Sequence, residues 1–456
     1  MPADATTVIE GASAAILAVA TSSALFRNAP AVVLAGADDK QSQADAAGVA
    51  VKLGVPLLLV AAPGEGLKAE IDRLGPSTIV ALGEAATAWA RSTYPAGGDS
   101  PDIVAGDALP AVTPEAPLAD LLALTQDDGS AAAVTAKAAG ARVLELRNPD
   151  PRASADAITA LAGQATARVV ALGSAFGPAD RLRQRIDTAA TGVQLPGGGQ
   201  VVFPGRRMVA LYGHPGSNVL GSMGEQPLPA AIARAKKVAA SYSSLVDEPV
   251  IPAFEIIATV ASAGAGSDGN YSNEVSISKL KPWVVEAGKA GLYVMLDLQP
   301  GRTDFLTQAK QYEELLKLPH VGLALDPEWR LGRNEIHMVQ IGSVRASEVN
   351  ATAQWLAELT RVNHLPQKVL MLHQFRLDMI TDRSTVRTDY DELRIVIHVD
   401  GFGGSSQKMA TWRTINRNAP AGVFWGWKNF YDEDKPTFTP KQTYAVKPNP
   451  VFVSYQ

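Results

Sequence analysis

The sequence VGLALDPEW, which runs from Val321 to Trp329, decides the fold. It begins with a continuous apolar stretch and ends in two acidic residues, Asp326 and Glu328. An unbroken apolar stretch is typical of a strand that is buried on both faces, as in a parallel sheet. Seven more stretches of this kind follow residue 200. The eight predicted strands are 208–212, 254–260, 291–297, 321–326, 369–373, 394–400, 422–427 and 451–455.

Stretches with helical periodicity lie between several of these strands. They cover residues 228–245, 303–316, 346–363 and 408–416. Eight strands that alternate with helices over about 250 residues have the size and pattern of a (β/α)8, or TIM, barrel. We therefore predict an α/β chain in which residues 199–456 form such a barrel. In a barrel of this kind the chemistry lies at the carboxyl ends of the strands.

The first part of the chain carries shorter apolar strands bounded by Gly and Pro. Two segments look like copies of one unit, because both end in Val-Ala-Leu-Gly, at 80–83 and 170–173. This pattern predicts βαβ units and a Rossmann-like parallel-sheet domain over residues 1–198. Residues 8–25 are Ala-rich and predict a helix, and residues 196–199 predict a linker. No complete G-x-G-x-x-G sequence follows either copy, so we predict no dinucleotide cofactor.

The composition excludes several classes of function. The 456 residues carry a net charge of −5 without a basic cluster, so nucleic acid is not an expected partner. Cys is absent, which excludes disulfides and thiol catalysis. No apolar stretch reaches the roughly 20 residues that span a bilayer, so we predict no integral membrane segment. The segment that starts at Met1 lacks the basic region of an intact signal peptide. Two interpretations stay open: a cytosolic start, or a secreted chain whose leader or lipid anchor has been removed.

Acidic residues gather at the predicted carboxyl ends of the barrel strands. Asp326 and Glu328 are two residues apart, so a period of two would point both side chains toward the barrel axis. Two carboxylates in such a site repel, which holds one of them protonated and ready to act as a general acid. We predict Glu328 as the acid and either Asp326 or Asp400 as nucleophile or electrostatic stabiliser. Asp297 and His398 would support them.

Aromatic and other polar residues at the same strand ends are candidates for substrate binding. Of the 28 Phe, Tyr and Trp residues only four precede residue 200, and all six His residues follow residue 213. Indole faces stack on sugar rings, which favours a carbohydrate partner, although large rings also fill barrel interiors. The predicted substrate-binding residues are Tyr212, His214, Trp329, His373, Gln374, Trp425, Trp427 and Lys428.

Some of these side chains could instead bind a metal ion. Imidazoles and carboxylates ligate zinc, but the chain contains neither H-x-H nor H-E-x-x-H. We therefore predict no metal and no other cofactor, and keep a metal-dependent hydrolase as an alternative function. The residues in question are His214, His373, His398, Asp297 and Asp326.

Both parts of the chain resemble known bacterial proteins. Residues 29–35, 52–59, 70–76 and 80–83 resemble the cell-wall-binding repeat type 2 family, which implies a Rossmann-like fold, an envelope location and binding to anionic wall polymers. Residues 296–301 and 325–329 resemble uncharacterised secreted lipoproteins of actinobacteria.

The triplet Asp326-Pro327-Glu328 resembles glycoside hydrolase families 18 and 25. In these families the Glu is the acid and the Asp orients or stabilises. Together the resemblances imply a secreted or envelope-associated glycoside hydrolase that acts on a cell-envelope polysaccharide. The alternative from another class is a glycan-binding protein without catalysis.

Overall fold

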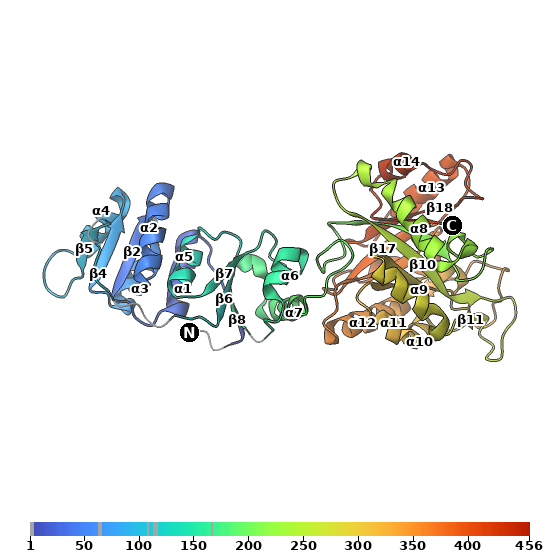
Figure 1. The fold of residues 1–456 in the computed structure, drawn as a ribbon, viewed down its shortest axis with the longest axis horizontal. Coiled ribbons are helices and arrows are strands. Elements are labelled where there is room, and N and C mark those ends of the chain that lie inside the picture. Colours follow the sequence, from blue (N-terminus) through green and yellow to red (C-terminus); the bar gives the residue numbers. More distant parts are fainter. Residues whose placement is uncertain (1–3, 63–65, 107–108, 113–116, 166) are drawn as a thin grey trace. The chain divides into compact units, whose positions relative to one another are not determined.

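The computed structural model describes residues 4–62, 66–106, 109–112, 117–165 and 167–456. Residues 1–3, part of the opening segment considered above, lie outside the described residues. The chain divides into two compact units, residues 1–192 and 193–456. Each unit is described by itself (Figure 1).

The first unit contains two parallel four-stranded sheets, as expected for a Rossmann-like α/β domain. The first sheet has the order β3-β2-β4-β5, and the second has the order β1-β8-β6-β7. Each of the two repeated segments therefore belongs to a sheet of its own. The strands are β1 Thr6–Ile9, β2 Ala31–Gly36, β3 Leu57–Val60, β4 Thr78–Leu82, β5 Asp102–Ala105, β6 Leu121–Thr125, β7 Arg142–Glu145 and β8 Arg168–Leu172.

Helices α1 and α5 pack against strands of both sheets in this unit. The N-terminus departs from the prediction of one helix over residues 8–25, because Thr6-Thr7-Val8-Ile9 forms β1. These residues are β-branched and favour a strand, and the helix begins only after Ser13, whose side chain accepts a hydrogen bond from the Ile16 N–H. The helices are α1 Ala14–Leu25, α2 Lys40–Leu53, α3 Leu67–Leu74, α4 Glu84–Thr93, α5 Ala131–Ala138, α6 Ala155–Leu161 and α7 Ala179–Ala190.

The second unit is a closed barrel of eight parallel strands, which confirms the predicted fold. The strands follow one another around the barrel in chain order, and the last one, β19, pairs with the first, β9. The short strand β11 Ser272–Glu274 adds to β10 in antiparallel orientation. The barrel strands are β9 Arg207–Gly213, β10 Val250–Ala261, β12 Tyr293–Leu298, β13 Val321–Leu325, β15 Lys368–His373, β17 Leu393–Val399, β18 Phe424–Asn429 and β19 Phe452–Tyr455.

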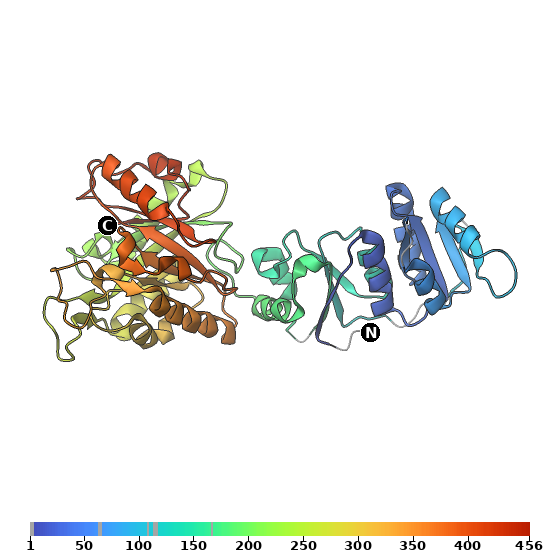
Figure 2. The same cartoon turned by 180° about the vertical axis from the view of Figure 1, so that it is seen from behind.

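Helices cover the outside of this barrel (Figures 1 and 2). The alternation of strand and helix is interrupted once, because the connection between β15 and β17 contains no α-helix. That connection holds two 3-10 turns, Leu377–Met379 and Arg383–Thr385, and the short strand β16 Ile380–Thr381, which pairs with β14 Val344–Arg345. The helices are α8 Leu228–Ala240, α9 Ile277–Lys289, α10 Phe305–Gln311, α11 Glu313–Leu316, α12 Ala346–Val362, α13 Ser405–Asn416 and α14 Pro440–Ala445.

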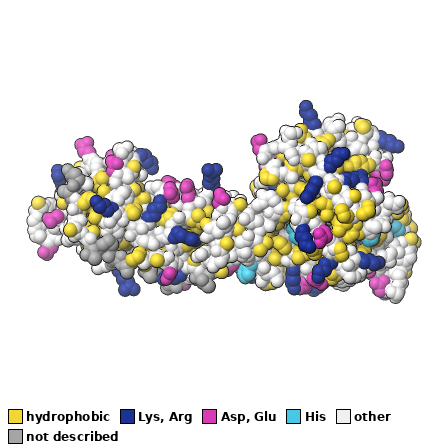
Figure 3. Space-filling model, viewed as in Figure 1, with side chains coloured by type: hydrophobic (Ala, Val, Ile, Leu, Met, Phe, Trp, Pro, Cys, Tyr) yellow, Lys and Arg dark blue, Asp and Glu magenta, His cyan; other side chains and the backbone are white. Residues whose placement is uncertain are grey.

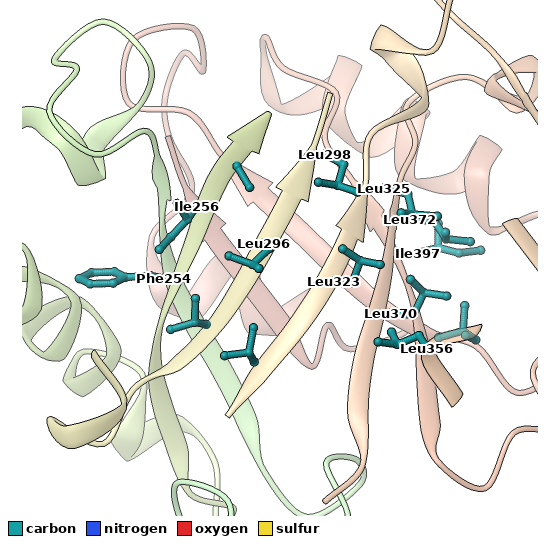
Figure 4. Packing of buried hydrophobic residues seen from close by; sticks show 14 of the residues in the cluster. Phe254, Ile256, Leu296, Leu298, Leu323, Leu325, Leu356, Leu370, Leu372 and Ile397 are labelled. Atoms are coloured by element: carbon teal, nitrogen blue, oxygen red, sulfur yellow. The ribbon is translucent and has the colours of Figure 1, made fainter. Parts of the chain in front are cut away.

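Alternate residues of each barrel strand face opposite sides, as strand geometry requires. One set, which includes Leu296, Leu323 and Leu370, belongs to the hydrophobic cluster that contains Leu356 of α12 (Figure 4). The other set, which includes Met295 and Ala324, forms a second cluster inside the barrel. The site residues that lie on these strands have the same parity as this inner set, so the strands direct them into the barrel.

The segment predicted as a linker is part of the second unit. Leu195, Val202 and Phe203 are buried in the inner cluster with residues near the starts of the barrel strands, such as Met208. The Arg206 guanidinium donates hydrogen bonds to the Pro196 and Gly198 carbonyl oxygens. Residues 195–206 therefore close the amino end of the barrel, and the opposite end carries the acids.

Charged side chains of both signs are interspersed over the visible face of the molecule (Figure 3). Within the described ranges, no helix combines the length and apolar character that a membrane span requires.

Candidate active site

A cluster of ionisable side chains fills the carboxyl end of the barrel. Its members come from β9, β10, β12, β15, β17 and β18 and from the ends that follow β13 and β17. Most are buried, and charged groups stay in such a place only when they are paired or neutralised. The cluster comprises Tyr212, Glu255, Asp297, Asp326, Glu328, His373, His398, Asp400 and Lys428.

His373 is the centre of the cluster. Its Nδ1 lies 2.9 Å from Asp400 Oδ2, and its Nε2 lies 2.8 Å from Glu255 Oε1. The same Nε2 lies 3.8 Å from Asp297 Oδ1. Burial alone would lower the pKa of His373, but Glu255, Asp400 and Asp297 together raise it well above its ordinary value. The imidazole is therefore protonated and donates one N–H to each of two carboxylates.

Asp297 is held from its other side by a phenol. The Tyr212 hydroxyl donates to Asp297 Oδ2 at 2.9 Å and accepts a hydrogen bond from Gln299 Nε2 at 3.2 Å. The Lys428 ammonium lies 3.6 Å from the centre of the Tyr212 ring, where a cation and the ring face attract. Burial raises the pKa of Asp297 to about 6, against the opposing effect of His373.

Asp326 shapes the turn that presents Glu328. Strand β13 ends at Leu325, and residues 327–329 form a 3-10 turn whose first N–H groups need acceptors. Asp326 Oδ1 accepts a hydrogen bond from the Glu328 N–H at 3.2 Å. The side-chain direction of Glu328 is therefore set by this turn and not by the period of two that the sequence suggested. Burial raises the pKa of Asp326 well above its ordinary value, so this carboxyl group is neutral.

Glu328 is the acid of the cluster that reaches a pocket. It is half-buried, and burial followed by the nearby charge of Asp400 raises its pKa to about 7. The pocket has a volume of about 480 Å³, within the range of roughly 300–1,000 Å³ that is common for small-ligand sites. It is lined by Glu328, Trp329, Met338, Val339, Gln340, Ile341 and Arg376.

His398 lies on β17 and Asp400 directly follows it, and the two side chains differ in charge. Burial would raise the pKa of Asp400, but the hydrogen bond from His373 outweighs it and the pKa is lowered, so Asp400 is a carboxylate. Burial lowers the pKa of His398 well below its ordinary value, so this ring is neutral. His398 Nε2 lies 2.8 Å from Ser454 Oγ. A side chain at Gly426 on the next strand would overlap His398 Nδ1, so only Gly leaves space for this ring.

Comparison with known proteins leaves this site to be interpreted from its own geometry. No protein-family model, curated protein or solved structure matches the chain.

The predicted catalytic side chains all lie in the cluster, but only three of the eight predicted binding residues do. Those three are Tyr212, His373 and Lys428. Trp427 is buried on the outer side of β18, where its ring lies 5.4 Å from that of Trp412. Trp425 is half-buried and packs against the same Trp412 ring at 5.7 Å. Both belong to the layer between barrel and helices. The expected role of Trp425 and Trp427 in sugar stacking therefore disagrees with their positions.

Three other predicted binding residues have structural partners. His214 is half-buried, and its Nδ1 lies 3.1 Å from the Ile257 carbonyl oxygen. Gln374 is buried, and its side-chain oxygen accepts a hydrogen bond from Arg383 at 3.0 Å. Trp329 lines the pocket, where it stacks on His337 with ring centres 4.7 Å apart. Of these three, only Trp329 faces the open space beside Glu328.

Sequence reasoning missed Glu255. It lies in the middle of β10, is fully buried and contacts His373. Its signal was a single acid inside an otherwise apolar strand that was expected to be buried on both faces, where a charge requires a partner. Together with His373 and His398, it forms the group of described residues that could hold a metal ion.

Proposed function

We propose that the second unit is a glycoside hydrolase that acts on a polysaccharide of the bacterial cell envelope. The carrying observation is the position of Glu328: a carboxyl group with a pKa of about 7 that opens onto a pocket beside an indole. At neutral pH about half of such groups are protonated, which suits a general acid whose pKa should lie near the working pH.

Asp400 is the partner that this chemistry requires. Hydrolysis of a glycosidic bond uses one protonated and one ionised carboxyl group, and environments that separate two pKa values mark the pair. Glu328 would donate its proton to the glycosidic oxygen. Asp400, fixed by the N–H of His373, would stabilise the positive charge that develops on the sugar or attack its anomeric carbon. Asp326 is neutral and accepts a hydrogen bond from the Glu328 N–H within the turn, so we assign it a positioning role.

The nature of the substrate rests on two further features. The Trp329 indole lines the pocket beside Glu328, and we assign the stacking of a sugar ring to the indole face that His337 does not cover. The resemblance of residues 29–83 to wall-binding repeats supports an envelope polysaccharide and a secreted or envelope-associated chain.

The test compares Glu328→Gln with a matched variant, Glu433→Gln, in hydrolysis of purified envelope polysaccharides. Glu433 is an exposed acid in the loop after β18, so its replacement removes the same charge without touching the pocket. Loss of a general acid costs roughly 10²–10⁴-fold in rate. We expect a loss of at least about 100-fold in kcat for Glu328→Gln and none for Glu433→Gln. Equal hydrolysis by both variants would remove Glu328 from the mechanism.

A specific observation favours the alternative, a glycan-binding protein without catalysis. Glu328 is the acid among the residues that line the pocket, whereas Asp400 is only 7% exposed. A substrate would have to reach past the pocket wall to touch both carboxyl groups. If the alternative holds, the protein binds the polysaccharide without releasing reducing ends, and Trp329→Ala weakens binding while Glu328→Gln does not.

A further inference from the structure

Three buried side chains inside the barrel form a group with the composition of a metal site. Glu255, His373 and His398 each offer one ligand atom, and these atoms all lie within 4.8 Å of one another. All three residues are fully buried. They come from β10, β15 and β17, rigid strands that fix the positions of the donors.

Several polar atoms in this place have no hydrogen-bond partner among the described residues. They are Glu255 Oε2, Asp297 Oδ1, His398 Nδ1 and Asp400 Oδ1, and each is shielded from solvent. Buried polar atoms are almost always satisfied, because a hydrogen bond left unmade away from water is costly. Their gathering around His373 indicates a group that is bound in this space and satisfies them.

The charges of the cluster point to a cation. Five carboxyl groups meet there with only two basic side chains, His373 and Lys428, so the cluster has an excess of acids. A divalent ion would allow nearby carboxyl groups to be ionised in a space where an unpaired carboxylate is costly. The five acids are Glu255, Asp297, Asp326, Glu328 and Asp400.

The surroundings of both imidazoles have the form that metal ligands show. A metal-bound His usually gives its other ring N–H to a carboxylate or another acceptor, which fixes the ring. His373 Nδ1 lies 2.9 Å from Asp400 Oδ2, which leaves Nε2 facing Glu255 and Asp297. His398 has one ring nitrogen at 2.8 Å from Ser454 Oγ. Each ring therefore has one anchored nitrogen. The other nitrogen of His373 holds the proton that it donates to Glu255, and the other nitrogen of His398 has no partner among the described residues.

We propose that Glu255, His373 and His398 bind a divalent transition-metal ion, with Asp297 as the nearest additional oxygen donor. Two imidazoles and a carboxylate favour zinc or a similar ion over calcium or magnesium, which prefer oxygen ligands. On binding, the ion takes the electron pair of His373 Nε2, and the proton on that nitrogen passes to solvent. This proposal goes beyond hydrolysis and does not depend on the identity of the glycan.

The experiment measures metal binding by the full chain after dialysis against a chelator. Zinc is titrated by calorimetry, and Co²⁺ is used as a spectroscopic probe of a site with nitrogen and oxygen ligands. We expect one zinc ion per chain. Glu255→Gln and His398→Gln should weaken binding at least about 100-fold, and Ser454→Ala, which removes only an anchor, about 10- to 100-fold. The control is His364→Gln, which removes an exposed imidazole after α12 and should bind as the wild type does.

The wild-type chain alone can overturn the proposal. If it takes up no stoichiometric zinc and gives no Co²⁺ absorption bands, the site does not exist. Equal zinc affinity in Glu255→Gln, His398→Gln and the wild type would place the metal elsewhere and also overturn it. Circular dichroism of each variant checks the fold, and Ser454→Ala keeps the comparison valid if a ligand variant does not fold. No glycan enters the assay, so its result is separate from that of the hydrolysis test.

Discussion

Replacing Glu328 by Gln should stabilise the protein at alkaline pH while it removes the proposed proton donor. Burial, followed by the Asp400 charge, raises the pKa of Glu328 from its ordinary value of 4.5 to about 7. The folded chain thus binds this proton more tightly than the unfolded chain does. The stabilising contribution is complete below about pH 4.5 and is lost as the pH rises through about 7. Gln has nearly the same shape and no charge, so it avoids this loss.

The size of the effect follows from the same shift. At about 1.4 kcal/mol per pH unit, the rise in pKa corresponds to roughly 3 kcal/mol. Glu328 is half-buried, so solvent screens part of this and we expect about 2 kcal/mol. The charges of Asp400 and Asp297 oppose ionisation of Glu328, and the positive charges of Lys428 and His373 favour it.

The assay is urea unfolding of wild type and Glu328→Gln between pH 4 and pH 9, followed by Trp fluorescence. Six of the seven Trp residues lie in the second unit, so this signal reports mainly on the barrel. The two proteins should be equally stable near pH 4, and the variant should be more stable by about 2 kcal/mol near pH 8. Glu433→Gln should show no such pH dependence. A variant that is less stable at pH 8, or a difference independent of pH, would refute the reasoning.

Two further predictions concern neighbouring residues. Gly426→Ala should lower the free energy of unfolding by about 1–3 kcal/mol, because the added methyl group overlaps the His398 ring. Urea unfolding measures this loss, and the control is Gly48→Ala, where the added methyl group meets no other atom. No loss in Gly426→Ala would mean that the ring moves freely. Trp329→Ala should raise KM or weaken glycan binding with little change in thermal stability, whereas Trp427→Ala, which creates a cavity, should cost about 3–5 kcal/mol of stability. If Trp427→Ala instead weakened glycan binding and Trp329→Ala lowered the stability, the sugar-stacking residue would lie on β18.

The architecture of the barrel could be predicted from the sequence because the strands are largely apolar stretches, most of them with polar residues near their carboxyl ends. The connection between β15 and β17 was assumed to follow the same pattern, but it contains short turns and the β16 strand. In the first unit, the last two residues of β1 were predicted as the start of the helix that follows it. Four residues carry little periodicity, so a short strand beside an Ala-rich helix gives no separate signal.

The site was predictable only in part. Asp297 lies near the end of β12, and Asp326 and Asp400 directly follow β13 and β17, so their meeting follows from barrel closure alone. An unbroken apolar strand does not reveal which side of the sheet a residue faces, so Trp425 and Trp427 were placed at the mouth although they face the helices. Glu255 and His373 are in contact but lie 118 residues apart in the chain. No local motif links them, and only the three-dimensional structure brings out their pairing.

The dependence of kcat on pH tests the central claim most directly. With purified envelope polysaccharide as substrate, the rate of the wild-type chain should fall as the pH rises through about 7, because Glu328 then loses the proton that it donates. In Glu328→Gln the remaining rate should be at least about 100-fold lower and should lack this fall. A wild-type rate that stays constant from pH 5 to pH 9, or a Gln variant with the wild-type profile, would contradict the assignment of Glu328 as the general acid.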